Sequence, residues 1–431
     1  MEASLVLKLI YVVIDGMGDT SINELGNKTP LEAADTPNMD FLAKNGKTGL
    51  MYTVRKGVAP ESDVAVISIL GYDPFKYSTG RGVLEAIGAN IALKDGDLAL
   101  RCNFATLGPN RKIIDRRAGR DLSAEDATKL SKAVNENVKL ESCSADFEFK
   151  NTIGHRAVLA IRSKEESLSS SITNTDPAYS RMEGLGVAKT MTEMVLKKCE
   201  PMDESEEAKI SAKLVNEFVE KSHIVLDEHE VNKKRVANGK LKANVILTRD
   251  AGHLLPKFFN INQKYGVHFI SLTDMPVERA ISKLAGMDTA TLLPPSGDLK
   301  KDCILRAEKL CELLPFYDCF YIHIKGPDEP AHDGNFELKT RLISLIDKYF
   351  FEMLLNRTKL EDFIICVTAD HSTPCKLKAH SDDPVPLLIS GNGIVGDDVA
   401  KFSEKECKKG SLGVLERGTE LMPKLMNFLR P

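Results

Sequence analysis

The sequence predicts an α/β fold, a doubly wound and mostly parallel sheet that carries an inserted, smaller α+β domain. Three apolar runs rich in β-branched and aromatic residues lack polar alternation, which is typical of strands covered on both faces. They are VLKLIYVVI (6–14), CFYIHI (319–324) and FIICVT (363–368). An amphipathic helical pattern lies between the last two runs, as in a β-α-β crossover, whereas the middle of the chain has a different texture.

The core elements follow one another from the N-terminus. The first strand ends abruptly at Asp15, and a short apolar helix over 64–70 follows the loop Ala59-Pro60-Glu61-Ser62-Asp63. Further core strands are expected at 243–247, 267–272 and 385–389, with core helices at 276–286, 301–314 and 338–353. Together these elements predict a layered core with helices on both faces of the sheet.

The middle of the chain predicts the inserted domain. Residues 95–240 contain alternating strands such as 155–161, a Ser-rich loop at 167–171, an acidic hinge at 200–207 and an amphipathic helix at 208–221. We therefore expect a core domain of residues 1–85 and 236–431 and an inserted domain of residues 86–235. Both boundaries rest on compositional cues, Gly80-Arg81-Gly82 and the basic stretch Lys233-Lys234-Arg235.

Bulk composition excludes several classes of protein. The 431 residues include 58 basic and 62 acidic side chains, so the net charge of −4 indicates no nucleic-acid partner. Nine Cys without a CxxC pair argue against a disulfide framework and a zinc ribbon, and they favour a reducing compartment. No run approaches the roughly 20 apolar residues of a membrane span. We expect a cytoplasmic enzyme with a small-molecule substrate, and the sequence leaves its oligomeric state open.

Acidic side chains and imidazoles follow the three buried strands. Asp15 follows the first, Asp328 and His332 follow the second, and Asp370 and His371 follow the third. Ligands of open α/β sheets bind beyond the carboxyl ends of the strands, and His380, nine residues after His371, can reach the same crevice. Carboxylate and imidazole donors without thiolates favour one or two Mn²⁺ or Zn²⁺ ions. Taken singly, each residue is better explained as a helix cap or a solvated loop residue, and only their joint placement favours the metal site.

Ser62 lies directly before the apolar helix 64–70. A serine at this position is first of all a helix cap. A hydroxyl at the positive end of a helix dipole and beside a divalent ion also loses its proton more easily, and it then becomes a nucleophile. The metal hypothesis therefore raises Ser62 as a candidate catalytic residue.

With these positions in place, the chain resembles the archaeal-type cofactor-independent phosphoglycerate mutases of the alkaline phosphatase superfamily. The resemblance covers almost the whole chain and rests on the order and spacing of the following segments. They are VIDGMGD (13–19), KTPLEAADTPNMDFLAKNG (28–46), APESDVAVISILGYDP (59–74), GRGVLEAIGA (80–89), KGPDEPAHDGN (325–335) and TADHSTPCKLKAHSDDPVPLLISG (368–391).

The resemblance implies a site with two divalent ions. It places one ion on Asp15, Ser62, Asp370 and His371, and the other on Asp328, His332 and His380. Mn²⁺ is the expected ion, with Mg²⁺, Zn²⁺ or Co²⁺ as alternatives. The implied reaction interconverts 3-phosphoglycerate and 2-phosphoglycerate through a phosphoserine at Ser62, without 2,3-bisphosphoglycerate. Because water would hydrolyse the phosphoenzyme, the inserted domain is expected to close over the site.

The inserted domain carries the densest group of cations in the chain. The segment from Arg111 to Asp121 contains five basic and two acidic residues. A basic run is usually a solvated surface, but Gly119-Arg120-Asp121 resembles a substrate-gripping segment of the wider mutase family. We therefore expect substrate contacts from arginine forks and their neighbours. The candidates in this segment are Arg116, Arg117, Arg120 and Asp121. Lys242 and Arg249, which flank strand 243–247, could stabilise the transferring group from the core side and are equally explained as surface cations.

Two alternatives to the mutase share the same ligands. A metal-dependent phosphomonoesterase, or a mutase of another phosphorylated metabolite, would differ only in the inserted domain. A non-catalytic binding protein would not need the intact ligand set or Ser62. The fate of the phosphoryl group distinguishes these hypotheses, since a mutase releases no phosphate.

Overall fold

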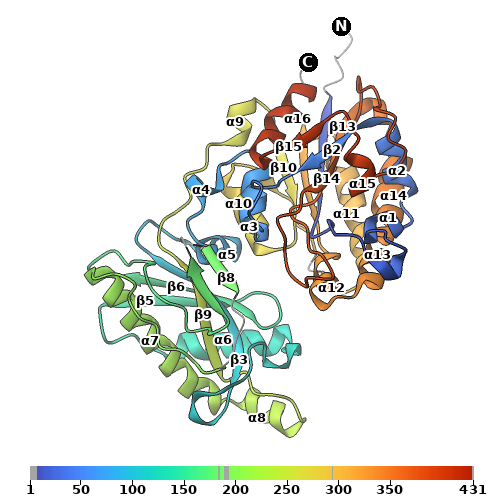
Figure 1. Cartoon of the computed structure of the whole chain (residues 1–431). Helices are drawn as coiled ribbons and strands as arrows, with labels where there is room; N and C mark the ends of the chain where they lie inside the picture. The colour runs from blue at the N-terminus through green and yellow to red at the C-terminus, as the bar shows by residue number, and fades with distance from the viewer. Residues whose placement is uncertain (1–6, 183–184, 189–193, 294, 430–431) are drawn as a thin grey trace. The chain divides into compact units, whose positions relative to one another are not determined.

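The computed structural model describes residues 7–182, 185–188, 194–293 and 295–429. The chain divides into two units (Figure 1). The core unit comprises Met1–Ser78 and Lys257–Pro431, and the insertion unit comprises Thr79–Pro256. Val6, the first residue of the predicted strand 6–14, lies outside the described residues.

The core unit contains an eight-stranded sheet in the order β11-β10-β12-β1-β13-β14-β2-β15. Strand β14 pairs antiparallel with both of its neighbours, and the remaining pairs are parallel. The predicted doubly wound, mostly parallel sheet is therefore confirmed. The strands are β1 (Lys8–Ile14), β2 (Gly46–Met51), β10 (Phe269–Leu272), β11 (Asp288–Thr289), β12 (Cys319–Ile324), β13 (Phe363–Thr368), β14 (Val385–Gly391) and β15 (Gly413–Leu415).

Strand β1 lies at the centre of this sheet, between β12 and β13. Its side chains from Leu9 to Ile14 are fully buried, as the unbroken apolar run predicts. The register pairs Ile14 with Ile324 on one side and Val13 with Thr368 on the other. Because the three strands are parallel and end at the same level, the residues that follow them meet at one edge of the sheet.

Helices cover both faces of the core sheet (Figure 1). Helices α3, α10 and α16 lie on one face, and α2, α11, α13 and α14 lie on the other. The helix predicted over 338–353 is α13 and α14 joined by a π-helical turn at Asp347–Phe351. The helices are α1 (Pro30–Ala33), α2 (Pro37–Lys44), α3 (Ser62–Ile69), α4 (Pro74–Tyr77), α9 (Ile261–Tyr265), α10 (Pro276–Leu284), α11 (Leu299–Leu313), α12 (Asp328–Asp333), α13 (Phe336–Ile346), α14 (Glu352–Arg357), α15 (Glu404–Cys407) and α16 (Leu421–Leu429).

The insertion unit has a sheet of its own. Strands β4, β3, β6 and β5 lie in that order, β9 also pairs with β3, and each pairing is antiparallel. Phe104, Phe149 and Phe218 join this sheet to helix α7 in one apolar core. The elements are β3 (Leu98–Leu107), β4 (Ile113–Asp115), β5 (Ala145–Asn151), β6 (Arg156–Ser163), β7 (Tyr179–Met182), β8 (Leu185–Ala188), β9 (Val245–Gly252), α5 (Arg81–Gly88), α6 (Ala124–Asn137), α7 (Glu206–Asp227) and α8 (Glu230–Ala237).

One predicted strand belongs to the other unit. The expectation that 243–247 joins the parallel core is wrong, because β9 pairs antiparallel with β3 of the insertion unit. The insertion unit consequently runs from residue 79 to residue 256 and includes α5 and β9, beyond both expected boundaries. A short apolar run identifies a strand, but it carries no information about the sheet that the strand joins.

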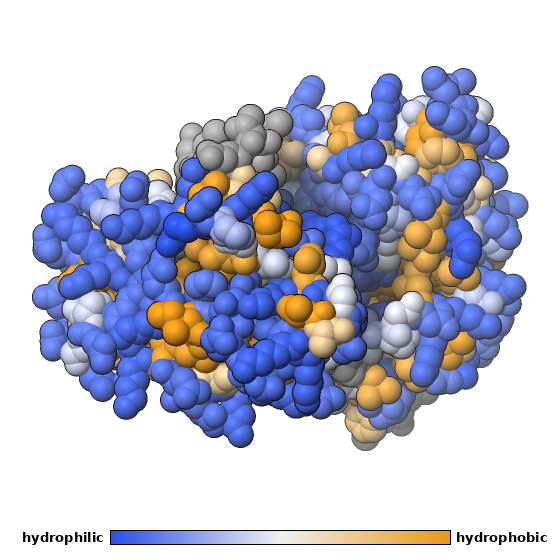
Figure 2. Space-filling model, turned by 90° about the horizontal axis from the view of Figure 1, so that it is seen from below, coloured by the Kyte–Doolittle hydropathy of each residue, from blue (hydrophilic) through white to orange (hydrophobic). Residues whose placement is uncertain are grey.

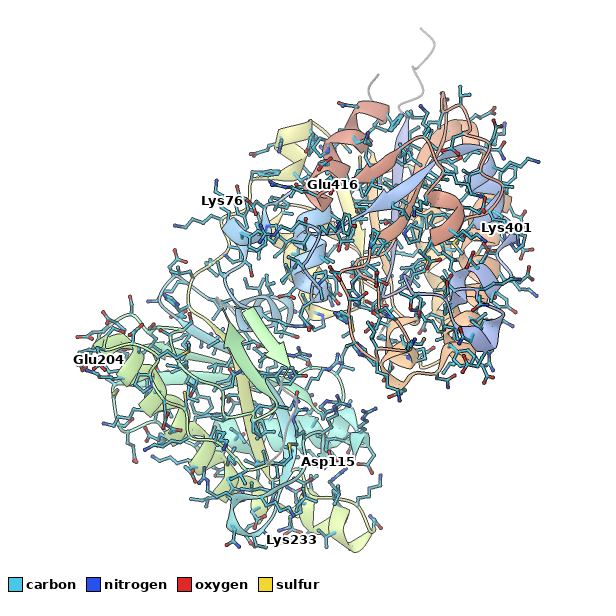
Figure 3. The ribbon with its side chains drawn as sticks, viewed as in Figure 1. Lys76, Asp115, Glu204, Lys233, Lys401 and Glu416 are labelled. Carbon is cyan, nitrogen blue, oxygen red and sulfur yellow. The ribbon has the colours of Figure 1, made fainter. Side chains whose placement is uncertain are left out.

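The surface is predominantly polar. On the face shown in Figure 2, apolar residues form separate patches among hydrophilic ones. Charged side chains such as Lys76, Lys401 and Glu204 are exposed and lie at the periphery of their own units (Figure 3). Within the described ranges, the helices are too short or too polar to span a lipid bilayer.

Candidate active site

Two groups of side chains that could hold a metal ion lie near the ends of β1, β12 and β13. The first group is Asp15, Asp370 and His371, and the second is Asp328, His332 and His380. Within each group the candidate ligand atoms all lie within 4.8 Å of one another. Parallel strand ends thus bring together six side chains that are spread from residue 15 to residue 380.

The first group presents two carboxylate oxygens to one imidazole nitrogen. Asp15 Oδ1 lies 3.5 Å and Asp370 Oδ2 lies 3.3 Å from His371 Nε2. Both oxygens are buried without a hydrogen-bond partner among the described residues. The other oxygen of Asp370 accepts hydrogen bonds from the backbone N–H groups of Gly16 and His371, each at 3.0 Å. A buried carboxylate oxygen without a donor is costly, and a bound cation removes that cost.

The second group is built around Asp328. Its Oδ2 lies 3.4 Å from His332 Nε2, four residues later on helix α12, and its Oδ1 lies 3.5 Å from His380 Nε2. The two imidazole Nε2 atoms are 3.2 Å apart. This group offers one carboxylate and two nitrogens, a donor set that suits a borderline divalent ion.

Each of the three imidazoles is oriented through its other nitrogen. His332 Nδ1 lies 3.1 Å from the Lys378 carbonyl oxygen and His380 Nδ1 lies 2.8 Å from the Pro60 carbonyl oxygen. His371 Nδ1 lies 3.0 Å from the Thr373 hydroxyl. Contacts of this kind fix the tautomer of a metal-binding histidine and leave Nε2 for the ion.

Ser62 is the first residue of helix α3 and does not cap it. The N-cap residue is Glu61, whose side chain makes no capping hydrogen bond. Ser62 is half-buried, and its Oγ lies 3.2 Å from His371 Nε2. The capping alternative is therefore not realised, and the hydroxyl faces the first group of ligands.

The two groups of ligands are in contact. The rings of His371 and His380 stack with their centroids 3.7 Å apart. Thr373 donates its hydroxyl hydrogen to Asp328 Oδ1 at 2.7 Å while facing His371 Nδ1. The two groups therefore form one site, with Ser62 on the side of the first group.

Burial and mutual contacts shift the titration of these side chains. Burial lowers the pKa of His371 to about 4, so its imidazole is neutral at pH 7. Burial also raises the pKa of Asp15 well above its usual range. Burial opposes the charged form of Asp328, but hydrogen bonds from His332 and His380 outweigh it and hold the pKa of Asp328 well below its usual range. Burial also opposes the charged form of His380, but the hydrogen bond to Asp328 outweighs it and raises the pKa of His380 to about 9. A divalent ion bound to Asp328 and His380 would displace the proton that His380 otherwise carries.

Three further side chains surround the first group and were not predicted. Lys325 Nζ lies 3.2 Å from Asp15 Oδ2 and 2.7 Å from Glu278 Oε1. His323 Nε2 lies 3.5 Å from Asp370 Oδ2. Lys325 directly follows strand β12, so the rule that found the acidic residues could have found it. Glu278 is on helix α10, so its position does not follow from the ends of the strands.

The structure gives partners to three of the candidates in the insertion unit. Arg116 makes a bidentate pair with Asp176, at 2.9 and 2.6 Å. Asp121 lies 2.6 Å from Arg235 and 3.3 Å from Lys240. Lys242 lies 2.9 Å from Asp227. These contacts lie within the insertion unit and hold its loops and helices together.

Arg249 is in a different environment. It is buried, and its Nε and Nη1 atoms lack hydrogen-bond partners among the described residues. Its guanidinium lies 3.9 Å from the centre of the Tyr179 ring. Burial, followed by the positive charges of Arg249 and Arg81, lowers the pKa of nearby Arg101 to about 9. Carboxylates of the same unit accompany these cations: Glu85 lies 3.5 Å from Arg81 and 3.4 Å from Arg101, and Asp250 lies 3.6 Å from Arg249. Arg117 is half-buried and Arg120 is exposed in the same unit.

Comparison with known proteins identifies the family. A model of the 2,3-bisphosphoglycerate-independent phosphoglycerate mutases matches residues 43–232. The mutase of that name from Aeropyrum pernix is 43% identical over 428 residues, which cover 98% of this chain and 100% of the relative. The one from Pyrococcus furiosus is 40% identical over 423 residues, covering 98% and 97%. A solved cofactor-independent phosphoglycerate mutase from Thermoplasma acidophilum is 30% identical, with a TM-score of 0.64 and coverage of 98% and 100%. The chain belongs to the family of 2,3-bisphosphoglycerate-independent phosphoglycerate mutases.

Proposed function

We propose that the protein interconverts 3-phosphoglycerate and 2-phosphoglycerate through a phosphoserine at Ser62, in a site with two divalent ions. The observation that carries the proposal is the position of Ser62 Oγ, 3.2 Å from His371 Nε2. Beside that nitrogen are the two buried, unpartnered oxygens of Asp15 and Asp370. The activity is the one for which the relatives are named.

The ligand atoms fit two ions. Asp15, Asp370, His371 and Ser62 would hold one, and Asp328, His332 and His380 would hold the other. Oxygen and imidazole donors without thiolates favour Mn²⁺, and Mg²⁺, Zn²⁺ and Co²⁺ suit related sets. Divalent ions in such a site lower the pKa of a bound hydroxyl and neutralise the phosphoryl oxygens.

The proposed reaction has two phosphoryl transfers that balance each other. In the first, Ser62 Oγ forms a bond to phosphorus, the bond from phosphorus to the glycerate oxygen breaks, and the proton released by Ser62 balances the one gained by that oxygen. Glycerate then turns within the site. In the second transfer its other hydroxyl oxygen attacks the phosphoserine, and Ser62 recovers its hydroxyl, so no bisphosphate is required.

The glycerate carboxylate needs a separate grip during this exchange. Among the six candidates of the insertion unit, we favour Arg249, because its buried Nε and Nη1 atoms lack hydrogen-bond partners among the described residues and its ion-pair contact with Asp250 is long, at 3.6 Å. Arg117 and Arg120 remain candidates as cations of the same unit. Arg116, Asp121 and Lys242 would have to leave ion pairs before they could contact substrate.

Phosphorus NMR of the purified protein with 3-phosphoglycerate and Mn²⁺ tests the proposal. We expect 2-phosphoglycerate to accumulate without inorganic phosphate. Ser62→Ala should lower kcat by at least about 10³-fold, because it removes the nucleophile. Ser123→Ala is the matched control, since Ser123 caps helix α6 and its loss should cost stability without loss of activity.

The alternative outcomes are distinct. Stoichiometric release of phosphate without the isomer would assign the protein to the phosphomonoesterases. Full activity of Ser62→Ala would exclude the phosphoserine route while leaving the family unchanged.

A further inference from the structure

Lys325 is a cation built into the edge of the first ligand group. It follows strand β12 directly, as Asp15 follows strand β1, and the backbone N–H of Asp15 donates to the Ile324 carbonyl at 3.0 Å. The register of the two parallel strands therefore sets Lys325 beside Asp15. Its ammonium lies 3.2 Å from Asp15 Oδ2, and its side chain is 27% exposed.

The two oxygens of Asp15 have different surroundings. Oδ2 faces Lys325, whereas Oδ1 faces His371 Nε2 at 3.5 Å and lacks a hydrogen-bond partner among the described residues. Asp370 is divided in the same way, since its Oδ1 accepts two backbone N–H groups and its Oδ2 faces His371. In each carboxylate, one oxygen is held by the protein and the other points to the imidazole nitrogen.

Glu278 holds Lys325 in this place. Its carboxylate is 2% exposed and lies 2.7 Å from the ammonium. Burial disfavours the charged form of Glu278, but Lys325 outweighs burial and lowers the pKa of Glu278 to about 2. The ammonium is therefore held by two carboxylates, one of them buried, so Lys325 is not a freely moving surface lysine.

We propose that Lys325, fixed by Glu278, is a positioning residue that holds Asp15 Oδ2 and so presents Asp15 Oδ1 to the divalent ion. The proposal rests on the ion site of the proposed function. Without the ammonium, the Asp15 carboxylate is free to rotate or to bind through both oxygens. When a side chain binds a metal ion through one atom, contacts to its other polar atom commonly change the affinity of the site for the ion.

The test measures ion binding directly. Mn²⁺ is titrated calorimetrically into the full chain carrying His332→Ala, which removes a ligand of the second group, with and without Lys325→Met. We expect Lys325→Met to weaken Mn²⁺ binding by about 10- to 100-fold. In the chain with all ligands intact, kcat should fall while the KM for 3-phosphoglycerate stays within about twofold, because the substrate contacts are unchanged.

Two matched variants sharpen the result. Lys309→Met removes a lysine that pairs with Glu312 on the surface of helix α11, and it should leave Mn²⁺ binding unchanged. Lys325→Arg keeps a cation and should recover part of the lost affinity. If Lys325→Met does not fold, Glu278→Gln decides, and it should weaken Mn²⁺ binding in the same direction.

Other outcomes overturn the inference. Tighter Mn²⁺ binding in Lys325→Met would mean that the lysine acts through charge repulsion alone. Unchanged binding with a raised KM would assign Lys325 to the substrate. A wild-type protein that binds Mn²⁺ without isomerising phosphoglycerate would contradict the proposed function and leave the positioning role to be judged by the titration.

Discussion

At the scale of single residues, both ring nitrogens of each imidazole in the site have defined neighbours. A backbone carbonyl or a threonine hydroxyl faces the Nδ1 atom of each of the three, and all three direct Nε2 toward a carboxylate. The sequence could indicate which residue types would meet, because parallel strands end together. It could not indicate these orienting contacts, because they come from loops whose conformations leave no periodic pattern.

Arg249 and Lys242 show the same limit in the insertion unit. Both flank the strand predicted at 243–247, so the sequence predicts the same role for both. In the structure Lys242 pairs with Asp227, whereas Arg249 is buried over Tyr179, with Asp250 3.6 Å from its Nε and no hydrogen bond to its Nε or Nη1 among the described residues. Adjacency to a strand end does not fix the direction of a long side chain.

Replacement of Arg249 tests its proposed contact with the substrate. We expect Arg249→Met to lower kcat/KM by about 10- to 100-fold, the loss of one or two charge-assisted hydrogen bonds. Most of the loss should be in KM if the arginine holds the glycerate carboxylate in all bound states. Arg162→Met is the control, because Arg162 pairs with Glu148 at 3.0 Å and is partly exposed. Equal kinetics for both variants would remove Arg249 from the substrate site.

At the scale of elements, the apolar runs located the buried strands β1, β12 and β13, and the acidic residues after them are in the site. The strand at 243–247 also exists, as β9, but in the antiparallel sheet. The difference has a physical cause. A short apolar run indicates that a strand is buried, but the strand with which it pairs depends on tertiary contacts that the run does not encode. The cue Gly80-Arg81-Gly82 lies beside the first division between the units, whereas the second division follows β9, well beyond Lys233-Lys234-Arg235.

Helix α7 offers a test of how charge stabilises the insertion unit. Glu217 accepts hydrogen bonds from the backbone N–H groups of Glu141 and Ser142 and lies 2.9 Å from Lys221. Burial alone would raise the pKa of Glu217, but these partners outweigh burial and lower the pKa to about 2. A depressed carboxyl pKa contributes stability that is present above about pH 4.5 and is lost as the pH falls toward about 2.

Urea unfolding at several pH values measures this contribution. After screening by water, we expect Glu217→Gln to cost about 1–2 kcal/mol at pH 7, with a difference from wild type that shrinks below about pH 4.5. Glu220→Gln, on the same helix with a 53% exposed side chain, should change stability much less. A cost that is independent of pH would mean that the amide fails to fit, without any contribution from charge.

At the scale of the whole molecule, the resemblance seen in the sequence is confirmed by relatives that match along nearly the full chain. The fold class followed from apolar patterning, and the family followed from motif spacing. The division into units could be predicted only roughly, because contacts that define a unit are between residues distant in the chain.

Removal of divalent ions should affect both activity and stability. We expect chelation with EDTA to abolish activity and added Mn²⁺ to restore it. Mn²⁺ at about 100 times its Kd should stabilise the protein by about 2.7 kcal/mol per site, which corresponds to roughly 3–5 °C in Tm. Scanning calorimetry checks this, and Asp328→Asn should show a smaller rise than wild type. Undiminished turnover after exhaustive chelation would be incompatible with the two-ion site.

The central place of β1 in the core sheet has a consequence for biosynthesis. The ribosome makes this strand long before its neighbours β12 and β13, which begin at Cys319 and Phe363. Until then its apolar side chains and backbone have no sheet to join, and the nascent chain carries an aggregation-prone segment. The antiparallel sheet of the insertion unit is complete once Gly252 has been added. Asp15 can therefore meet Asp370 and His371 only after more than 350 further residues have been made, and a truncated chain that stops before Asp370 cannot assemble the first group of candidate ligands.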